Sequence, residues 1–340
     1  MNARAKSLTV RAYLKAIATT NRPVILGPYR SELGFEHLYY IPFLHWALSS
    51  AGISKDRCLA VSRGGMGKLY PAASAVDLYD LRGVEAVRLE NATDHRERGI
   101  QKQTTVTPWD RQVAADALAR SWQDGQIDCT EADVARRRFH LLHPSWMYWL
   151  LDDYWEEKRG VRHVVEHCRF EELPVPVLPE GFGLPQKFLA VRFYERATFP
   201  LVPEVRGYVR EMVANLAARR PVVLLSQSGH FDDHTDLPLA GANILRLPEV
   251  PPAQNFLLQA AVIARCNAFV GTYGGVAQWA LRYRRPSLSF YTSFGQTAVA
   301  HWSLSRHLAN TANLPFEVVD LKAWKLWQMA LTPMLEQVAA

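Results

Sequence analysis

The sequence has few cysteines, and it lacks the features that mark several classes of protein. The four cysteines are scattered without a Cys-x-x-Cys pair, so we expect no zinc site and free thiols in a reducing compartment. No apolar run approaches the length that spans a bilayer, and the first residues lack the apolar core of a signal peptide. No block of like charges forms a nucleic-acid-binding arm, so no nucleic-acid partner is expected. These absences favour the cytoplasm, with the inner face of the membrane as an alternative.

The composition is that of a globular protein. The chain of 340 residues is long enough for two domains, and its 49% apolar and 21% charged residues are typical of a soluble fold. The net charge of +6 suits an anionic small molecule, a polyanionic acceptor or an acidic membrane surface. It does not choose among these partners.

In the first half, short apolar runs alternate with helical spans. A helix expected at 34–52 contains Pro42, which predicts a kink or a break. The segment 94–169 has helical spans and no strand signal, so we interpret it as a helical insertion or lid. The alternation predicts a parallel sheet wrapped by helices, with strands at 23–26, 58–61, 76–79 and 86–89.

The segment LPVPVLPEGFGLP, at 173–185, is rich in proline and glycine and predicts a domain linker. After it the alternation returns, and an amphipathic helix at 323–338 ends the pattern. We therefore predict an α/β fold with two Rossmann-like domains. The strands expected in the second half lie at 188–193, 222–226, 244–247, 268–270, 288–290 and 317–319.

The stretch AFVGTYGGVAQWALRYRRPSLSFY, at 268–291, is the most informative about function. It predicts a strand, a glycine turn, a helix and a second strand. The N-terminus of such a helix suits a phosphate group, although the spacing matches neither the dinucleotide fingerprint nor the P-loop. An ordinary βα turn without a ligand remains the alternative. The candidate donor-binding residues here are Gly271, Thr272, Tyr273, Gly274 and Gly275.

The strand FLAVRF places Arg192, Tyr194 and Arg196 at or beyond its carboxyl end. An arginine near the end of a central strand needs an anion to neutralise it. A diphosphate is one candidate, and an internal salt bridge to Glu195 or Asp232 is the other.

The loop after the first strand, GPYRSELGFE, contains Arg30, Glu32 and Glu36. Polar groups at the carboxyl end of a parallel strand face the crevice in which such folds bind ligands. We favour Glu32 as a general base, with Arg30 nearby to keep it ionised, and take Glu36 as the second choice. An acidic residue in the first turn of a helix also simply complements the helix dipole, which is the alternative for Glu36.

Two further loops carry candidate polar residues. In SRGGMGKLY, Arg63 and Lys68 lie among glycines and suit an anionic substrate, or else they form a solvated basic turn. The loop SQSGHFDDHTDL contains Asp232, Asp233 and His234. Its spacing matches no dedicated metal site, so we expect it to contact a nucleotide or cap a helix, and we expect no bound metal.

With these residues placed, the chain resembles bacterial glycosyltransferases of the GT-B type. The resemblance rests on GPYRSELGFEHLYYIPF, SRGG, VRFYERATFP and VGTYGGVAQWAL, which are similar to transferases of cell-surface polysaccharide synthesis and, more loosely, to fucosyltransferase-like enzymes. It implies an acceptor-side Rossmann-like domain at 1–175 and a nucleotide-sugar-binding one at 186–320. It also implies a C-terminal helix at 321–340 that crosses back to the first domain.

The resemblance further implies transfer of a sugar from a nucleotide-sugar to a hydroxyl group of a glycan or glycolipid, without a metal or other cofactor. Arg192, Arg196, Gly274 and Gly275 would stabilise the departing diphosphate, and Glu32 would deprotonate the acceptor in an inverting reaction. A retaining enzyme would not need that base. The alternatives are a nucleotide-sugar epimerase of the same architecture and a non-catalytic glycan-binding subunit.

Overall fold

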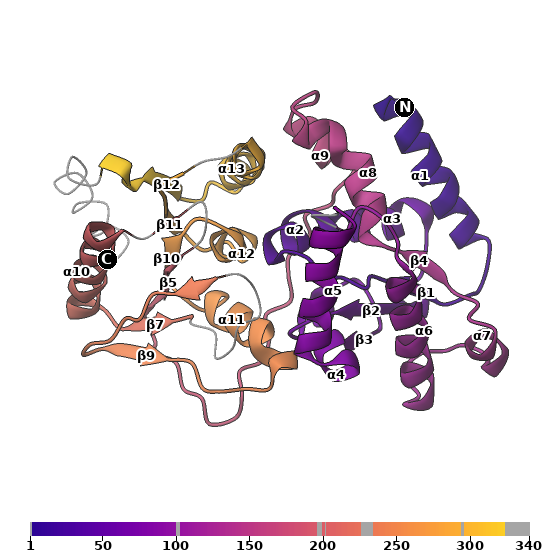
Figure 1. Ribbon diagram of the computed structural model, residues 1–340, viewed down its shortest axis with the longest axis horizontal. Coiled ribbons are helices and arrows are strands. Elements are labelled where there is room, and N and C mark those ends of the chain that lie inside the picture. The colour runs from indigo at the N-terminus through magenta and orange to yellow at the C-terminus, as the bar shows by residue number, and fades with distance from the viewer. Residues whose placement is uncertain are drawn as a thin grey trace. The chain divides into compact units, whose positions relative to one another are not determined.

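The computed structural model describes residues 2–99, 103–195, 199–200, 202–225, 234–293 and 296–323. The chain divides into two compact units, whose elements are labelled in Figure 1. Unit 1 comprises Met1–Glu172 with Pro252–Phe256, and unit 2 comprises Leu173–Pro251 with Leu257–Ala340. Each unit contains a parallel sheet with helices packed on it, which confirms the α/β class. The Pro- and Gly-rich segment 173–185 belongs to the start of unit 2.

Unit 1 contains a four-stranded sheet with the order β3-β2-β1-β4, in which every neighbouring pair is parallel. Because β2 and β3 follow β1 on one side and β4 lies on the other, the strand order reverses between β1 and β4. The crevice at the carboxyl ends of such a pair is where open α/β sheets bind ligands. The strands are β1 (Val24–Leu26), β2 (Cys58–Ser62), β3 (Ser74–Asp77) and β4 (His140–Leu142).

The helices of unit 1 form layers on this sheet. Helix α1 contacts α3 and α8, and α6 contacts β2 and β3. The α-helices are α1 (Ala3–Ala18), α2 (Leu33–Phe35), α3 (Ile41–Ala51), α4 (Leu78–Arg82), α5 (Val84–Glu97), α6 (Pro108–Gln123), α7 (Glu131–Ala135), α8 (Pro144–Trp155) and α9 (Val161–Val165). Short helical turns are the π-helix η1 (Glu36–Tyr40) and the 3₁₀ turns η2 (Lys55–Arg57), η3 (Met66–Leu69) and η4 (Pro252–Gln254).

The expected helix at 34–52 is present, with its interruption near Pro42. The π-helical turn η1 ends at Tyr40, and Pro42 lies in the first turn of α3, where its missing N–H is not needed. The helix ends at Gly52, whose φ of 67° is the left-handed conformation that glycine adopts readily.

Two expectations for unit 1 differ from the structure. The segment 94–169 is helical over most of its length, but it also contains β4, which pairs with β1 and completes the sheet. This strand lies between helical spans and has no glycine turn after it, unlike the equally short β1, which is followed by Gly27-Pro28. The strand expected at 86–89 is wrong, because these residues lie in α5, where Val87 alone of the four is buried.

Unit 2 contains a six-stranded parallel sheet with the order β12-β11-β10-β5-β7-β9. Figure 1 shows α10 on one side of this sheet and α11, α12 and α13 on the other. The strand order reverses between β5 and β10. The strands are β5 (Leu189–Arg192), β7 (Val222–Leu224), β9 (Ile244–Arg246), β10 (Ala268–Thr272), β11 (Ser287–Tyr291) and β12 (Phe316–Asp320), with a separate antiparallel pair β6 (Tyr194–Glu195) and β8 (Thr235–Asp236).

The helices of unit 2 cover a core built from alternating positions of these strands. Leu189, Val191 and Phe193 of the β5 segment pack with one face of α10, where Val209 and Met212 are buried. The helices are α10 (Pro203–Arg219), α11 (Asn255–Ile263), α12 (Gly275–Arg282) and α13 (Gln296–Thr311), and a 3₁₀ turn η5 (Leu321–Ala323) follows β12.

The helix expected at 323–338, and with it the proposed crossing back to the first domain, lies outside the described residues. Among the residues that the structure describes, no helix combines the length and hydrophobicity needed to cross a bilayer.

Candidate functional site

In unit 2, the predicted donor-binding residues that the structure describes meet where the strand order reverses. Gly271 of β10 is the register partner of Arg192 of β5. Thr272 ends β10, and α12 begins at Gly275. The carboxyl ends of β5 and β10 therefore bring together the arginine and the glycine turn, which are almost eighty residues apart in the sequence. This crevice is the position at which doubly wound sheets bind ligands.

Arg192 is buried, with 3% of its surface exposed. Its Nε donates to Oδ1 of Asp236 at 3.0 Å, and its guanidinium carbon lies 5.0 Å from the centre of the Tyr194 ring. The expected internal partners were Glu195 or Asp232. Glu195 instead pairs with Arg206 at 2.6 Å, and Asp232 lies outside the described residues. The carboxylate on β8 thus holds one edge of the guanidinium and fixes its orientation.

Gly271 and Thr272 join β10 to the end of β5. A Cβ on Gly271 would lie 2.1 Å from the carbonyl oxygen of Arg192, so no other residue fits there without a backbone shift. The hydroxyl of Thr272 accepts from the N–H of Tyr194 at 3.1 Å and donates to the carbonyl of the same residue at 3.2 Å. These contacts hold the backbone after Arg192 against the start of the glycine turn.

Helix α12 begins directly after this turn. Its cap residue is Gly274, which has no side chain, and the first helical bond runs from the N–H of Gln278 to the carbonyl of Gly274 at 3.2 Å. The N–H of Tyr273 donates to Phe290 of β11, which fixes the turn to the sheet. The N-terminus of α12, the positive end of the helix dipole, therefore lies at the carboxyl end of the sheet. Its first turn contains no acidic side chain, and this arrangement suits a phosphate group.

Of the other candidates in unit 2, His234 stacks on Tyr194 with ring centres 4.2 Å apart. Arg196, Asp232 and Asp233 lie outside the described residues. The histidine thus lies beside Tyr194 of β6, directly after the end of β5.

In unit 1, the two glutamates of the first loop occupy different environments. Glu32 is exposed and occupies the N-cap position of α2 without a capping hydrogen bond from its side chain, and the hydroxyl of Tyr29 donates to its carbonyl oxygen at 2.8 Å. Glu36 is fully buried and accepts from the hydroxyls of Ser62 and Tyr70, the latter at 2.6 Å. Burial raises the pKa of Glu36 to about 7, although the positive charge of Arg63 opposes the shift.

Arg63 is buried rather than open to a substrate. Its Nη1 lies 3.3 Å from Oε2 of Glu36, its Nη2 donates to the carbonyl of Ser31, and its guanidinium lies 5.0 Å from the Phe256 ring centre. We expected Arg63 to contact an anionic substrate, but in the structure it pairs with the carboxylate of Glu36 instead. Lys68, in η3, is exposed, so its contact with an anionic substrate stays a prediction.

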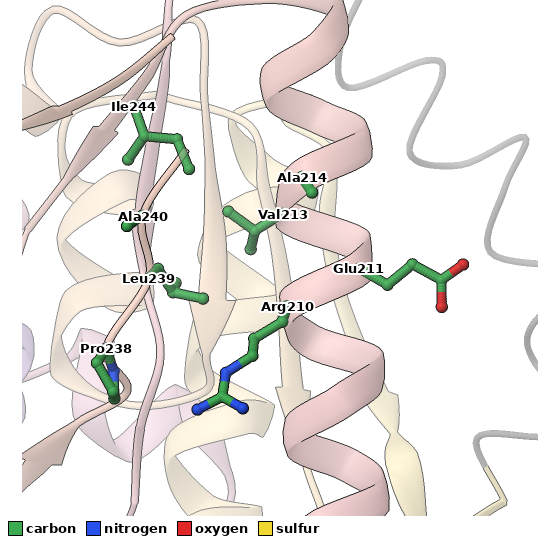
Figure 2. A pocket seen from close by; sticks show the side chains of 8 residues that line it. All are labelled: Arg210, Glu211, Val213, Ala214, Pro238, Leu239, Ala240 and Ile244. Carbon is green, nitrogen blue, oxygen red and sulfur yellow. The ribbon is translucent and has the colours of Figure 1, made fainter. Parts of the chain in front are cut away.

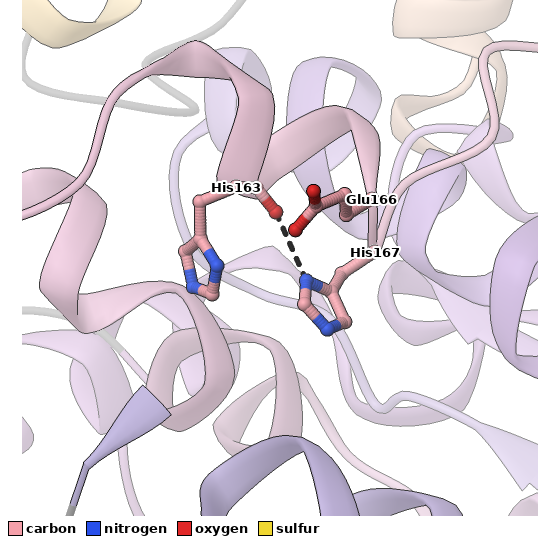
Figure 3. A group of neighbouring side chains, drawn as sticks. All are labelled: His163, Glu166 and His167. Carbon is pink, nitrogen blue, oxygen red and sulfur yellow. Dashed lines mark hydrogen bonds between the residues drawn. The ribbon is translucent and has the colours of Figure 1, made fainter. Parts of the chain in front are cut away.

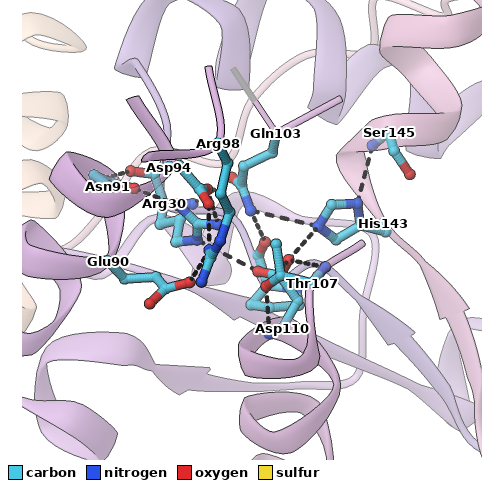
Figure 4. Close-up of polar contacts among 11 residues, drawn as sticks. Arg30, Glu90, Asn91, Asp94, Arg98, Gln103, Thr107, Asp110, His143 and Ser145 are labelled. Carbon is cyan, nitrogen blue, oxygen red and sulfur yellow. Dashed lines mark hydrogen bonds and ion pairs between the residues drawn. The ribbon is translucent and has the colours of Figure 1, made fainter. Parts of the chain in front are cut away.

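Arg30 also differs from expectation. Its guanidinium contacts Asp94, Asp110 at 3.3 Å and Asn91 at 2.7 Å in a buried network at the carboxyl ends of β1 and β4 (Figure 4). Burial by itself would raise the pKa of Asp110, but its hydrogen bond and charge interaction with His143, together with Arg30, lower it to about 2. The guanidinium is therefore part of the structure that holds the loop after β1, and two carboxylates neutralise it.

Sequence reasoning missed the partners in these networks, namely Asp94, Asp110, His143 and Asp236. The signal for Asp110 was present, because Thr107-Pro108-Trp109-Asp110 forms a capping box at the start of α6. His143 also has a local role, since its side chain caps α8 directly before Pro144. Asp94 and Asp236 come from distant parts of the sequence, and no local pattern pairs them with an arginine. A further missed group, His163, Glu166 and His167, is described below.

A hollow in unit 2 lies away from the candidate phosphate site and has a volume of about 620 Å³. Figure 2 shows its lining side chains on α10 and on the segment that leads to the edge strand β9. Its walls are mainly apolar, and its only charged lining residues are Arg210 and Glu211. It contains no residue of β5, β10 or α12, so it is not the candidate phosphate site.

No protein-family model matches the chain, and no curated protein matches it. Several solved structures similar to the chain are glycosyltransferases. E. coli heptosyltransferase WaaC with ADP is 12% identical over 82% of this chain and 90% of that one, with a TM-score of 0.42. The glycosyltransferase SnogD from Streptomyces nogalater is 16% identical over 93% and 92%, with a TM-score of 0.39. A family 9 glycosyl transferase from Veillonella parvula is 10% identical over 93% and 91%, with a TM-score of 0.41. At such TM-scores a likeness establishes no shared function, so the residues described above carry the proposal that follows.

Proposed function

We propose that the chain is a glycosyltransferase that moves a sugar from a nucleotide-sugar to a hydroxyl group of a glycan or glycolipid. The observation that carries the proposal is the position of Arg192, a buried guanidinium at the reversal of strand order, next to the glycine-capped helix α12. An oriented cation and a helix N-terminus that lie together at the carboxyl ends of two central strands form a site for a diphosphate.

In this proposal unit 2 binds the donor. Asp236 orients Arg192, so that its guanidinium meets the diphosphate without first losing side-chain entropy. Gly274 and Gly275 let the phosphates approach the backbone at the start of α12, where the helix dipole favours negative charge. Arg196, four residues beyond Arg192 in the sequence, would add a second cation.

The reaction breaks the bond between the sugar and the diphosphate and forms one to the acceptor oxygen. Negative charge grows on the departing diphosphate, where Arg192 and the start of α12 stabilise it in place of a metal ion. We propose Glu32 as the base that takes the proton of the acceptor hydroxyl, because it is the exposed carboxylate of the first loop of unit 1. Glu36 supports this loop indirectly, since it pairs with Arg63, which donates to the carbonyl of Ser31.

The acceptor is proposed to bind to unit 1, with Lys68 as an exposed cation for an anionic acceptor. The resemblance of the motifs to transferases of cell-surface polysaccharide synthesis supports a glycan or glycolipid. A glycolipid acceptor would bring the protein to the inner face of the membrane, which its net charge of +6 favours.

A screen of nucleotide-sugars tests the proposal, with released nucleoside diphosphate as the readout. We expect one donor class to release nucleotide faster when a glycan or glycolipid acceptor is added. Conversion of a donor to its isomer or to free sugar without any acceptor would instead indicate an epimerase. Binding of a glycan with no turnover of any donor would indicate a non-catalytic subunit.

A further inference from the structure

Three side chains with metal-binding atoms lie together around the end of α9 in unit 1. They are His163, Glu166 and His167, and one ligand atom of each lies within 4.8 Å of the others (Figure 3). Their spacing follows from the helix, since residues three and four positions apart project on the same side. None belongs to the loops at the carboxyl ends of the sheet, so the group is separate from the candidate transfer residues.

The hydrogen bonds of the two histidines determine which ring nitrogens carry protons. Nε2 of His163 lies 3.0 Å from the carbonyl oxygen of Leu150, and Nδ1 of His167 lies 2.9 Å from that of His163. A carbonyl oxygen only accepts hydrogen bonds, so both of these nitrogens are donors. In the neutral rings, the lone pairs then belong to Nδ1 of His163 and Nε2 of His167. A backbone carbonyl behind each imidazole is the usual support of a metal-binding histidine.

The two lone pairs have different surroundings. Nε2 of His167 lies 3.0 Å from the hydroxyl of Ser7 on α1, which donates to it. Nδ1 of His163 has no hydrogen-bond partner among the residues that the structure describes, and the atom is not fully buried, so solvent reaches it. A lone pair in contact with solvent can bind a cation without displacing a protein partner.

Glu166 supplies the negative charge of the group. Its carboxylate is exposed and lies 3.0 Å from Nε of Arg162, whose side chain is 90% exposed. Exposed ion pairs of this kind contribute little free energy. The carboxylate of Glu166 can therefore leave Arg162 and bind a metal ion at a small cost in free energy. Figure 3 shows Glu166 and the two imidazole rings on the same side of the chain.

We propose that His163, Glu166 and His167 bind one zinc ion, or a divalent transition metal of similar chemistry, with water as the fourth ligand. Two neutral imidazoles and one carboxylate are a donor set that zinc accepts, whereas magnesium and calcium prefer oxygen ligands. The bound ion replaces the Ser7 hydroxyl at His167 and takes the solvent-accessible lone pair of His163. Its position on α9 gives it a stabilising role in unit 1, independent of sugar transfer.

The test is zinc binding by the full-length, metal-free protein, measured in competition with a chromophoric chelator. We expect one site per chain. Glu166→Gln, His163→Ala and His167→Ala are each expected to weaken zinc binding at least about 10-fold, the lower end of the loss typical for groups that only support a metal ligand. His95→Ala, which removes an exposed histidine of α5, is the matched control and leaves the affinity unchanged.

Two further measurements distinguish this site from binding by the cysteines or from misfolding. Cobalt(II) in the site is expected to show no thiolate-to-metal charge-transfer band, and Ser7→Ala is expected to bind zinc at least as tightly as the wild type, because it removes the competing donor at His167. Glu166→Gln changes an exposed side chain and keeps the fold, so it is informative even where a histidine variant fails to fold. Failure to bind zinc, or equal affinity in Glu166→Gln and wild type, overturns the proposal.

Discussion

Gly271 and Arg192 face each other across the β5–β10 pair so closely that a Cβ on the glycine would lie 2.1 Å from the arginine carbonyl oxygen. The glycine therefore sets the distance between the strand that carries the buried guanidinium and the turn that opens α12. A backbone shift here would move both parts of the proposed diphosphate site at once.

Gly271→Ala is expected to destabilise the protein by about 1–3 kcal/mol, the usual cost of forcing an extra carbon into a packed interior. Donor binding is expected to weaken as well. Gly207→Ala is the control, since Gly207 lies in α10 and nothing lies within 4 Å of its added Cβ. That variant is expected to gain roughly 0.5–1 kcal/mol from helix propensity. Denaturant unfolding of both variants measures the difference, and equal stabilities would contradict the close contact.

Arg192→Ala is expected to weaken binding of a nucleoside diphosphate by about 1.5–3 kcal/mol, the value of a hydrogen bond to a charged group. Arg206→Ala serves as the comparison, because this arginine of the same unit is half-exposed and pairs with Glu195. Isothermal titration of both variants gives the affinities. Equal losses, or no loss in Arg192→Ala, would remove Arg192 from the donor site.

The sequence predicted the two sheets well and their polar networks poorly, for a physical reason. The turn at 271–275 and the arginine of β5 were identified because strand, glycine turn and helix form a local pattern. The salt bridge of Arg192 to Asp236 and those of Arg30 to Asp94 and Asp110 join residues forty-four, sixty-four and eighty positions apart. Nothing in the local sequence specifies which distant carboxylate folds against a given arginine. The strand β4 was missed because it lies between helical spans without a glycine turn, whereas the equally short β1 is marked by Gly27-Pro28.

Glu32→Gln is expected to lower turnover by about 10²–10⁴-fold while leaving stability and donor affinity nearly unchanged, because the side chain is exposed and the variant only removes a proton acceptor. Steady-state kinetics with a saturating donor measures this. Full activity of the variant would exclude Glu32 as the base and favour a retaining reaction.

Glu36→Gln tests the buried glutamate through the pH dependence of stability. The pKa of Glu36 rises from 4.5 to about 7 on folding, so the native state binds this proton more tightly than the unfolded chain. Its contribution is fully present below pH 4.5 and is lost as the pH rises through about 7. The unfolding free energy of the wild type minus that of Glu36→Gln is therefore expected to fall by about 3 kcal/mol over this interval. A difference that stays constant or rises with pH would show that Arg63 outweighs burial.

The most direct test of the account is a crystal structure of the protein with a bound nucleoside diphosphate. We predict that the phosphates contact the guanidinium of Arg192 and the backbone N–H groups at the start of α12, next to Gly274 and Gly275. Phosphates bound only by residues of unit 1, with no ligand at the carboxyl ends of β5 and β10, would contradict the central claim.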